Sequence, residues 1–246
     1  MIKSLLIAFL SLPTLVLAQG DGNTSIKSFN KAKRLLLSEV YAKPGDRRTI
    51  YCDAVFDGKK NVTLPEGFTT TRYKNRLARY ETEHVVPAEN FGRTFSEWRD
   101  GHPQCVNNKG KPFKGRKCAE KVNTEYRYMQ SDMFNLYPAI GSVNAARQNY
   151  NFVMLPDSSS GFGSCDMQIE GRKAQPPVGA RGEIARTYLY MESAYPRYSM
   201  SKSQRQLMNA WDNQYPVTAF ECHRASVIEQ VQGSYNTIMR QRCAQR

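Results

Sequence analysis

The sequence has few of the residues and none of the short motifs on which many hydrolases depend. It contains three histidines, no His-Glu-x-x-His segment and no Cys-x-x-Cys pair. These motifs are the usual sources of zinc ligands. A glycine-rich loop of the Walker type, which would cradle nucleotide phosphates, is also missing. The sequence therefore argues against a zinc protease and against a P-loop nucleotide hydrolase.

Acidic residues are scarce relative to basic ones. The chain has 35 Lys and Arg against 22 Asp and Glu, a formal net charge of +13. Removal of the first 18 residues would take away only Lys3 and leave +12. Such an excess predicts attraction to polyanions. By itself it leaves nucleic acid, an anionic membrane and an anionic glycan as candidate partners.

Long apolar runs are confined to the N-terminus. Lys3 precedes an apolar run from Leu5 to Leu17, and Ala18 ends a segment of small and apolar residues. This layout is typical of a secretory signal peptide cleaved after Ala18. The run is short for a bilayer span and contains Pro13, which argues against a membrane anchor. We expect residues 1–18 to be a signal peptide and residues 19–246 to be one exported domain without a membrane segment.

The six cysteines are an even number in a chain that is expected to leave the cytoplasm. Oxidising compartments favour disulfides, and six cysteines allow fifteen pairings. Proximity in sequence favours Cys105 with Cys118 and Cys222 with Cys243, which leaves Cys52 with Cys165.

The alternation of apolar and polar residues indicates a mixed α/β domain. Helical spacing and turn signals predict helices at 25–41, 125–137, 142–150, 182–195, 203–212 and 226–232, and strands at 49–56, 79–86 and 165–169. Residues 89–121 are polar and rich in Gly and Asn, and read as a long loop. We interpret the basic residues of helix 25–41 as a solvent-facing side.

Glu83 and His84 stand side by side near the end of the strand predicted at 79–86, which Pro87 terminates. A carboxylate can hold a hard divalent cation, and a neutral imidazole can accept a proton from water. Together they are a minimal set for metal-assisted hydrolysis. Neighbouring side chains of an ideal strand point to opposite faces, so this site requires an irregular strand end.

The loop at 89–121 ends in a run of basic residues. Its members are Lys109, Lys111, Lys114, Arg116, Lys117 and Lys121, with Glu120 as the one acid among them. Contact with phosphate is the functional interpretation, and a solvated basic loop is the alternative.

Five segments carry a resemblance to a known family. They are Glu83-His84, Lys114 to Cys118, Asp132 to Asn144, Arg147 to Phe152 and Arg181 to Met191. In this order and spacing the chain, from about Tyr51 to its C-terminus, resembles the bacterial endonuclease I family. These are secreted or periplasmic non-specific nucleases of the ββα-metal (His-Me finger) class. The resemblance implies an α+β single domain with a ββα-metal core and disulfide bonds.

The resemblance also implies site residues and a reaction. His84 would be the general base and Arg116 would bind the scissile phosphate. Mg²⁺, with Mn²⁺ or Ca²⁺ as alternatives, would be held by Glu83 and Asn144. Substrate-binding roles are expected for Lys114, Lys117 and Arg147. The implied activity is hydrolysis of DNA, and also of RNA, without sequence preference, by a periplasmic or secreted monomer that leaves 5′-phosphate ends.

Two departures from the family pattern stand out. Gln130 occupies a position where relatives usually carry a glutamate, which affects the expected metal affinity more than the reaction class. Relatives also carry an additional cysteine pair near Asp53, which this chain lacks, and we expect its loss to affect stability more than chemistry.

Two hypotheses from other classes remain open at this point. The chain could be a secreted nucleic-acid-binding protein whose catalytic site is impaired, an alternative that Gln130 favours. It could also be a metal-dependent phosphodiesterase for a small or lipid substrate. Cleavage of plasmid DNA, and competition by duplex DNA against a chromogenic diester, distinguish the three.

Overall fold

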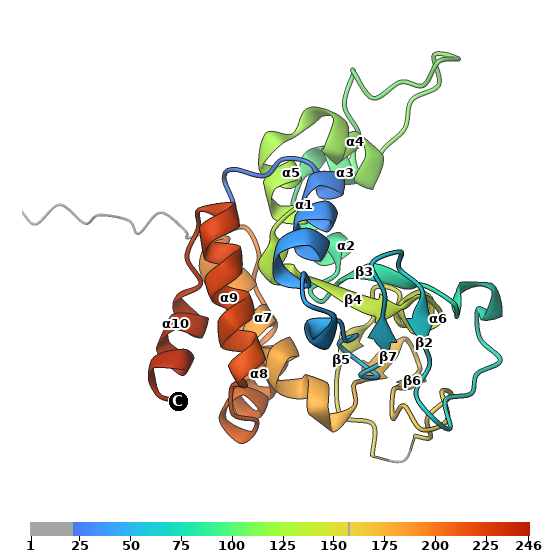
Figure 1. The fold of residues 1–246 in the computed structure, drawn as a ribbon. Coiled ribbons are helices and arrows are strands. Elements are labelled where there is room, and N and C mark those ends of the chain that lie inside the picture. The colour runs from blue at the N-terminus through green and yellow to red at the C-terminus, as the bar shows by residue number, and fades with distance from the viewer. Residues whose placement is uncertain (1–21, 157) are drawn as a thin grey trace, which may run out of the picture.

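The computed structural model describes residues 22–156 and 158–246. The predicted signal peptide lies outside these residues. The described chain forms one mixed α+β domain (Figure 1). Its N-terminal part is α1 (Phe29–Leu35), which runs on into a π-helical turn at Leu36–Val40. Ser28 caps this helix, because its side chain accepts a hydrogen bond from the backbone N–H of Lys31. The helix predicted at 25–41 is therefore present, although it starts later.

An antiparallel hairpin lies at the centre of the domain. β3 (Tyr80–His84) pairs with β4 (Leu136–Ile140), with Tyr80 opposite Ile140 and His84 opposite Leu136. All five residues of β4 are buried. α6 (Gly141–Arg147) follows β4 without a connecting loop and lies beside the hairpin (Figure 1). The predicted strand at 79–86 and the predicted helix at 142–150 match β3 and α6.

The prediction was wrong for β4, which falls at the end of the helix expected at 125–137. α5 (Thr124–Gln130) stops early, and a 3-10 turn at Met133–Asn135 leads into the strand. Pro138 fits this strand because β4 has a single neighbour. Its carbonyl accepts a hydrogen bond from the backbone N–H of Ile50 at 2.9 Å, on the side away from β3. The missing N–H of proline therefore removes no hydrogen bond from the hairpin.

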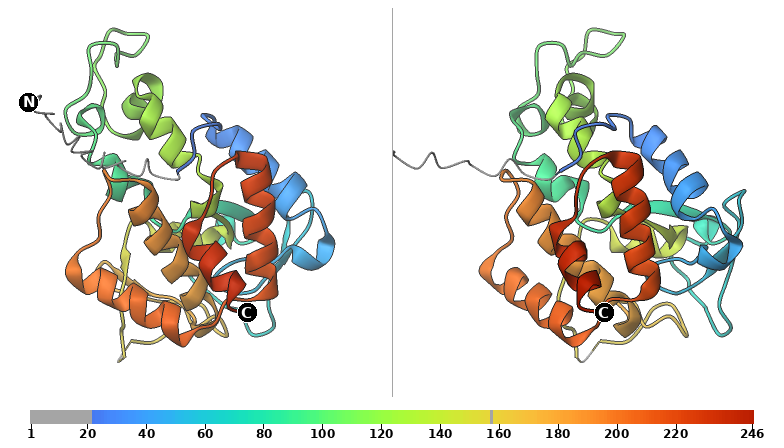
Figure 2. Two further views of the ribbon diagram at one scale, coloured as in Figure 1. Left: turned by 90° about the vertical axis from the view of Figure 1, so that its left-hand side faces the viewer. Right: turned by 60° about the vertical axis from the view of Figure 1, so that its left-hand side comes forward.

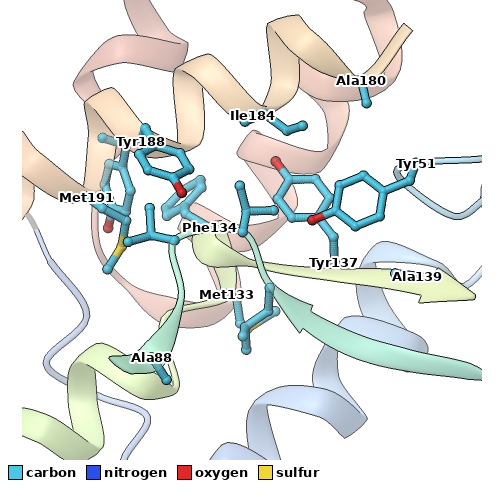
Figure 3. Close-up of a cluster of buried hydrophobic side chains, with 14 of the residues drawn as sticks. Tyr51, Ala88, Met133, Phe134, Tyr137, Ala139, Ala180, Ile184, Tyr188 and Met191 are labelled. Carbon is cyan, nitrogen blue, oxygen red and sulfur yellow. The ribbon is translucent and has the colours of Figure 1, made fainter. Parts of the chain in front are cut away.

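The main core lies between the hairpin and α7 (Arg181–Ala194). Figure 3 shows Ile184, Tyr188 and Met191 of α7 together with Phe134 and Tyr137 in this layer, and all five are buried. α8 (Lys202–Gln214) packs on α7, and α10 (Thr237–Ala244) packs on both α7 and α9 (Ala219–Gln232). Burial of these aromatic and aliphatic side chains is the main stabilising contribution to the domain.

Two of the C-terminal helices agree with expectation, and two do not. α7 and α8 match the predicted helices at 182–195 and 203–212. α9 begins seven residues before the predicted start of 226, because Thr218 and Glu221 form a capping box. The helix α10 was not predicted at all.

The loop expected at 89–121 contains three short helices. They are α2 (Ala88–Gly92), α3 (Ser96–Arg99) and α4 (Arg116–Val122). The prediction of irregular structure holds for residues 100–115, which extend away from the body of the domain (Figures 1 and 2). The disulfide between Cys105 and Cys118 ties this loop back to α4.

The remaining strands are short. The strand predicted at 49–56 is reduced to β1 (Val55–Phe56), which pairs with β2 (Val62–Thr63). Asp53 has a left-handed φ of 49°, which turns the chain before β1. A second small sheet has the order β5 (Asn151–Phe152), β7 (Lys173–Gln175), β6 (Gln168–Glu170). Only β6 overlaps the strand predicted at 165–169. Further 3-10 turns lie at Pro44–Asp46, Lys74–Arg76 and Val178–Ala180.

All three predicted disulfides are confirmed, namely Cys52–Cys165, Cys105–Cys118 and Cys222–Cys243. In the part of the chain that the structure describes, no helix is both long enough and apolar enough to cross a membrane.

Cys52–Cys165 closes the longest loop, with 113 residues of separation against 21 for Cys222–Cys243. A longer closed loop restricts the unfolded chain more strongly. Replacing both cysteines of the first pair by serine should lower the free energy of unfolding by about 4 to 5 kcal/mol, against about 3 kcal/mol for the second. Denaturant unfolding of the mature protein measures both losses. Equal losses, or a larger loss for the shorter loop, would contradict this ordering.

Candidate active site

Residues from three distant parts of the sequence share one pocket. Glu83 and His84 come from β3, Arg116 is the first residue of α4, and Asn144 lies in α6. The pocket has a volume of about 300 Å³. The structure therefore brings together the four residues that the sequence proposed for catalysis and metal binding.

Glu83 projects from β3 toward α6 and is 4% exposed. Its Oε1 accepts hydrogen bonds from the Tyr51 hydroxyl and from Arg147 Nη1, each at 2.7 Å. Burial raises the pKa of Glu83 above its ordinary value, against the opposing effects of the Arg147 charge and the Tyr51 hydrogen bond. Among the described residues no hydrogen bond reaches Oε2, so this oxygen remains available as an acceptor or ligand.

Asn144 is oriented by an acid that was not among the expected site residues. Its Nδ2 donates to Glu81 Oε2 at 3.0 Å, which leaves Oδ1 directed elsewhere. Arg76 and Arg79 bind the same carboxylate. Burial alone would raise the pKa of Glu81, but hydrogen bonds from Arg76 and Asn144 bring it below its ordinary value. The available signal was the spacing, because Glu81 precedes Glu83 by two residues and shares its strand face.

Two polar contacts therefore join β3 to α6. Glu81 pairs with Asn144, and Glu83 pairs with Arg147. The acids are two residues apart on a strand, and their partners are three residues apart on a helix, so each set shares one face. These contacts hold the strand and the helix in register at the pocket.

His84 points to the other face of β3. Its ring lies 4.9 Å from the Phe29 ring and 6.4 Å from the Phe91 ring, measured between centroids. Nε2 lies 2.8 Å from the backbone carbonyl of Gln130. A carbonyl only accepts, so Nε2 carries the proton and Nδ1 carries the lone pair. Burial, and then the positive charge of Arg116, lower the pKa of His84 to about 3, which keeps the ring neutral near pH 7.

Glu83 and His84 reach one pocket although neighbouring side chains of a strand point to opposite faces. Glu83 and His84 do point to different neighbours, α6 and α5 respectively, as strand alternation requires. Both still line the same pocket, because β3 ends at His84 and Pro87 leads into α2.

Arg116 starts α4 next to a residue that must be glycine. Gly115 has φ of 79° and ψ of −157°, a conformation in which a side chain is strained. The guanidinium carbon of Arg116 lies 5.2 Å from the centre of the Phe29 ring, and its Nε is 3.4 Å from Gln130 Oε1. Gln130 is fully buried, and it contacts His84 through its backbone carbonyl and Arg116 through its side chain. Because its side chain is an amide, its contact with Arg116 is not an ion pair.

The structure corrects the role expected for Arg147, which was predicted to bind substrate. Arg147 is fully buried. Besides Glu83, its guanidinium donates to the carbonyls of His84 and Val85 at 2.8 and 2.6 Å, and it stacks on Phe152. With its donors satisfied and no exposed surface, it cannot contact a phosphate. The helix predicted at 142–150 includes Arg147 correctly. The sequence alone could not show that Arg147 would pair with Glu83 in the interior of the domain.

Lys114 and Lys117 flank Arg116 and are exposed. Neither takes part in an ion pair with any residue of the described chain. Their assignment to substrate binding stays a prediction.

The pocket suits a hard divalent cation. Glu83 Oε2 and Asn144 Oδ1 are oxygen donors whose other atoms are held by protein partners. No group of three or more His, Cys, Asp or Glu side chains in metal-binding arrangement occurs in residues 22–156 and 158–246. A cation bound here would thus keep most of its coordination sites for water and phosphate, which is the preference of Mg²⁺.

The fold and the pocket define a class of protein: a disulfide-bonded α+β domain with an acid, a neutral imidazole, an amide and a guanidinium around one site. Residues 36–243 match the Endonuclease I family. Three relatives cover most of this chain. A "Periplasmic deoxyribonuclease" of Aeromonas hydrophila is 37% identical over 88% of this chain and 87% of its own length. An "Extracellular deoxyribonuclease" of the same organism is 37% identical over 89% and 90%. "Endonuclease-1" of Buchnera aphidicola is 34% identical over 89% and 83%. The chain belongs to the endonuclease I family, which confirms the resemblance seen in the sequence.

Proposed function

We propose that this protein is a divalent-metal-dependent endonuclease that hydrolyses the phosphodiester bonds of DNA without sequence preference. The observation that carries the proposal is the convergence of Glu83, His84, Arg116 and Asn144 on one pocket. The pocket belongs to a chain with a formal charge of +13, of which +12 remains without residues 1–18, and this charge attracts nucleic acid.

His84 acts as the general base. Its Nδ1 removes a proton from the water that attacks the scissile phosphorus. Nε2 keeps its hydrogen bond to the Gln130 carbonyl, which holds the ring in place and stabilises the imidazolium that forms. The stacking of Phe29 against the ring further limits its rotation.

Arg116 binds the phosphate that is attacked. A guanidinium can donate two parallel hydrogen bonds to phosphate oxygens and stabilise the negative charge that grows in the transition state. Arg116 Nη2 has no hydrogen-bond partner within the described chain, although it is buried. This supports a role in which its donor is directed to substrate rather than to protein.

Glu83 and Asn144 would hold the metal, with Mg²⁺ as the expected ion and Mn²⁺ or Ca²⁺ as alternatives. When bound, such a cation supplies positive charge at the phosphate and at the leaving 3′ oxygen, which favours 5′-phosphate products. Arg147 and Tyr51 fix Glu83, and Glu81 fixes Asn144. The succession of β3, β4 and α6, with the acid on β3 and the amide on α6, supports assignment to the ββα-metal class.

The relatives named as deoxyribonucleases support DNA as the substrate, and RNA is proposed as a second one because the proposed roles of the site residues involve only the phosphodiester backbone. Phosphate contacts position a nucleic acid without reading its bases, and the sequence contains no recognisable base-reading motif. The names of the relatives, the three disulfides and the N-terminal sequence support a periplasmic or secreted protein, which we propose acts as a monomer.

Metal removal tests the proposal. The mature protein should convert supercoiled plasmid to fragments with Mg²⁺, lose this activity in EDTA, and regain it when Mg²⁺ is restored. Asn144→Ala should raise the Mg²⁺ concentration for half-maximal activity by about 10-fold or more, because an oxygen ligand is lost. Asn108→Ala, an exposed asparagine of the projecting loop, is the matched control.

Undiminished cleavage in EDTA would remove the metal from the proposal. An intact plasmid at every metal concentration, with DNA binding retained, would instead favour a nucleic-acid-binding protein whose site is impaired.

A further inference from the structure

Helix α1 brings a second cation near Arg116. Phe29, its first residue, covers the His84 ring and also carries two positive groups. Lys33 Nζ lies 4.6 Å from the centre of the Phe29 ring, and the guanidinium carbon of Arg116 lies 5.2 Å from it. The two cations therefore lie no further apart than the sum of these distances. The charges of this helix are expected on a solvent-facing side, and Lys33 is partly exposed there while it also lies against Phe29.

Lys60 brings a third cation from the turn between β1 and β2. Its φ is 74°, a left-handed conformation that is uncommon for a residue with a side chain. The turn is closed by a hydrogen bond from Lys60 N to Asp57 O at 3.1 Å. Tyr80 N, at the start of β3, donates to Lys60 O at 3.1 Å, and Lys60 Nζ lies 5.9 Å from the Tyr80 ring. Lys60 is thus anchored to the strand that carries Glu83 and His84.

These three cations lie along one face of β3, because Lys60 is over Tyr80, and the Phe29 ring that carries Lys33 and Arg116 packs on His84 of the same strand face. Burial lowers the pKa of Lys33, and the positive charges of Lys60 and Arg116 lower it further. Glu120 opposes this effect from a distance. No residue of the described chain forms an ion pair with Lys33, Lys60 or Arg116. A cluster of like charges without a protein counter-ion costs folding free energy, and a bound anion relieves that cost.

We propose that Lys33 and Lys60 form a phosphate-binding subsite for the phosphodiester next to the scissile one, on the same nucleic-acid strand. The inference rests on the proposed function, which places the scissile phosphate at Arg116. A strand carries one negative charge per nucleotide, so a chain that enters the pocket presents its next phosphate close to the first. Ammonium groups bind such a phosphate as point charges and read no base. The subsite thus favours a polynucleotide over a ligand with one phosphate.

Binding measurements test the subsite directly. Lys33→Met and Lys60→Met, each in the full mature chain carrying His84→Ala to prevent cleavage, should weaken binding of a short DNA duplex equally for different sequences. Fluorescence anisotropy over a salt series should show the slope of log affinity against log salt reduced by about 1 for each variant. The matched controls are Lys31→Met on α1 and Lys59→Met beside Lys60, which remove the same charge from exposed positions outside the subsite.

Kinetics with substrates of two lengths separate the subsite from the reaction itself. In the background with His84 intact, Lys33→Met should raise KM for an oligonucleotide and leave kcat and KM unchanged for a dinucleotide that carries one phosphodiester. Equal losses on both substrates would overturn the proposal, because Lys33 would then act at the scissile phosphate. Salt slopes identical to those of Lys31→Met and Lys59→Met would overturn it as well. In both cases cleavage of plasmid by the unaltered protein would leave the proposed function standing, whereas failure of that cleavage would remove the proposed function itself.

Discussion

Replacement of His84 by alanine is expected to reduce the rate of DNA cleavage by about 10²- to 10⁴-fold, the usual contribution of a positioned general base. The physical reason is the arrangement of the ring. Nε2 is committed to the Gln130 carbonyl at 2.8 Å, so Nδ1 is the atom that can accept a proton, and burial keeps it unprotonated near neutral pH. Alanine removes that acceptor but leaves Arg116 in place, so the affinity for DNA should change little.

The measurement is the initial rate of plasmid cleavage at saturating Mg²⁺, with DNA affinity measured in parallel. His102→Ala is the matched control, because His102 is exposed in the loop that projects from the domain. Unfolding curves of both variants are required, since alanine also removes the contact of His84 with Phe29. Cleavage by His84→Ala at the rate of the unaltered protein would remove the assigned base.

Replacement of Arg147 by methionine is expected to lower the free energy of unfolding by about 3 to 5 kcal/mol. The variant leaves the Glu83 carboxylate buried without its counter-ion, and breaking a buried pair by removing one partner is strongly destabilising. It also leaves the carbonyls of His84 and Val85 without their donors. Chemical denaturation measures the loss.

Arg48→Met is the matched control for this effect. Arg48 pairs with Asp53, but both side chains are more than half exposed, so the change should cost about 1 kcal/mol or less. Combining Arg147→Met with Glu83→Met should recover part of the lost stability, because no buried charge then remains unpaired. An Arg147→Met variant of unchanged stability and weakened DNA binding would restore the substrate-binding role that the burial of Arg147 contradicts.

Local sequence patterns were sufficient where neighbours along the chain decide the structure. Strand alternation located β3, helical spacing located α6, α7 and α8, and proximity in sequence indicated two of the disulfides. Together with the family resemblance, these patterns named Glu83, His84, Arg116 and Asn144 before any of them could be placed in space.

The errors occurred where distant contacts decide. Residues 136–140 form a strand because β3 is beside them, and the apolar residues around Pro138 do not by themselves distinguish a strand from the end of a helix. Lys33 comes near Arg116 only because α1 packs with Phe29 against His84.

The sequence by itself determined the chemistry that is available to this protein: an excess of positive charge, an acid beside a histidine, an arginine after a glycine, and an even set of cysteines. Only the tertiary structure decided which of these groups face the pocket. In the folded chain, Arg147 is buried against Glu83, and Asn144 is oriented by its hydrogen bond to Glu81. The proton on His84 Nε2 points to the backbone carbonyl of Gln130. The reason is that orientation and burial depend on contacts between residues more than forty positions apart, and spacing along the chain carries no information about those contacts.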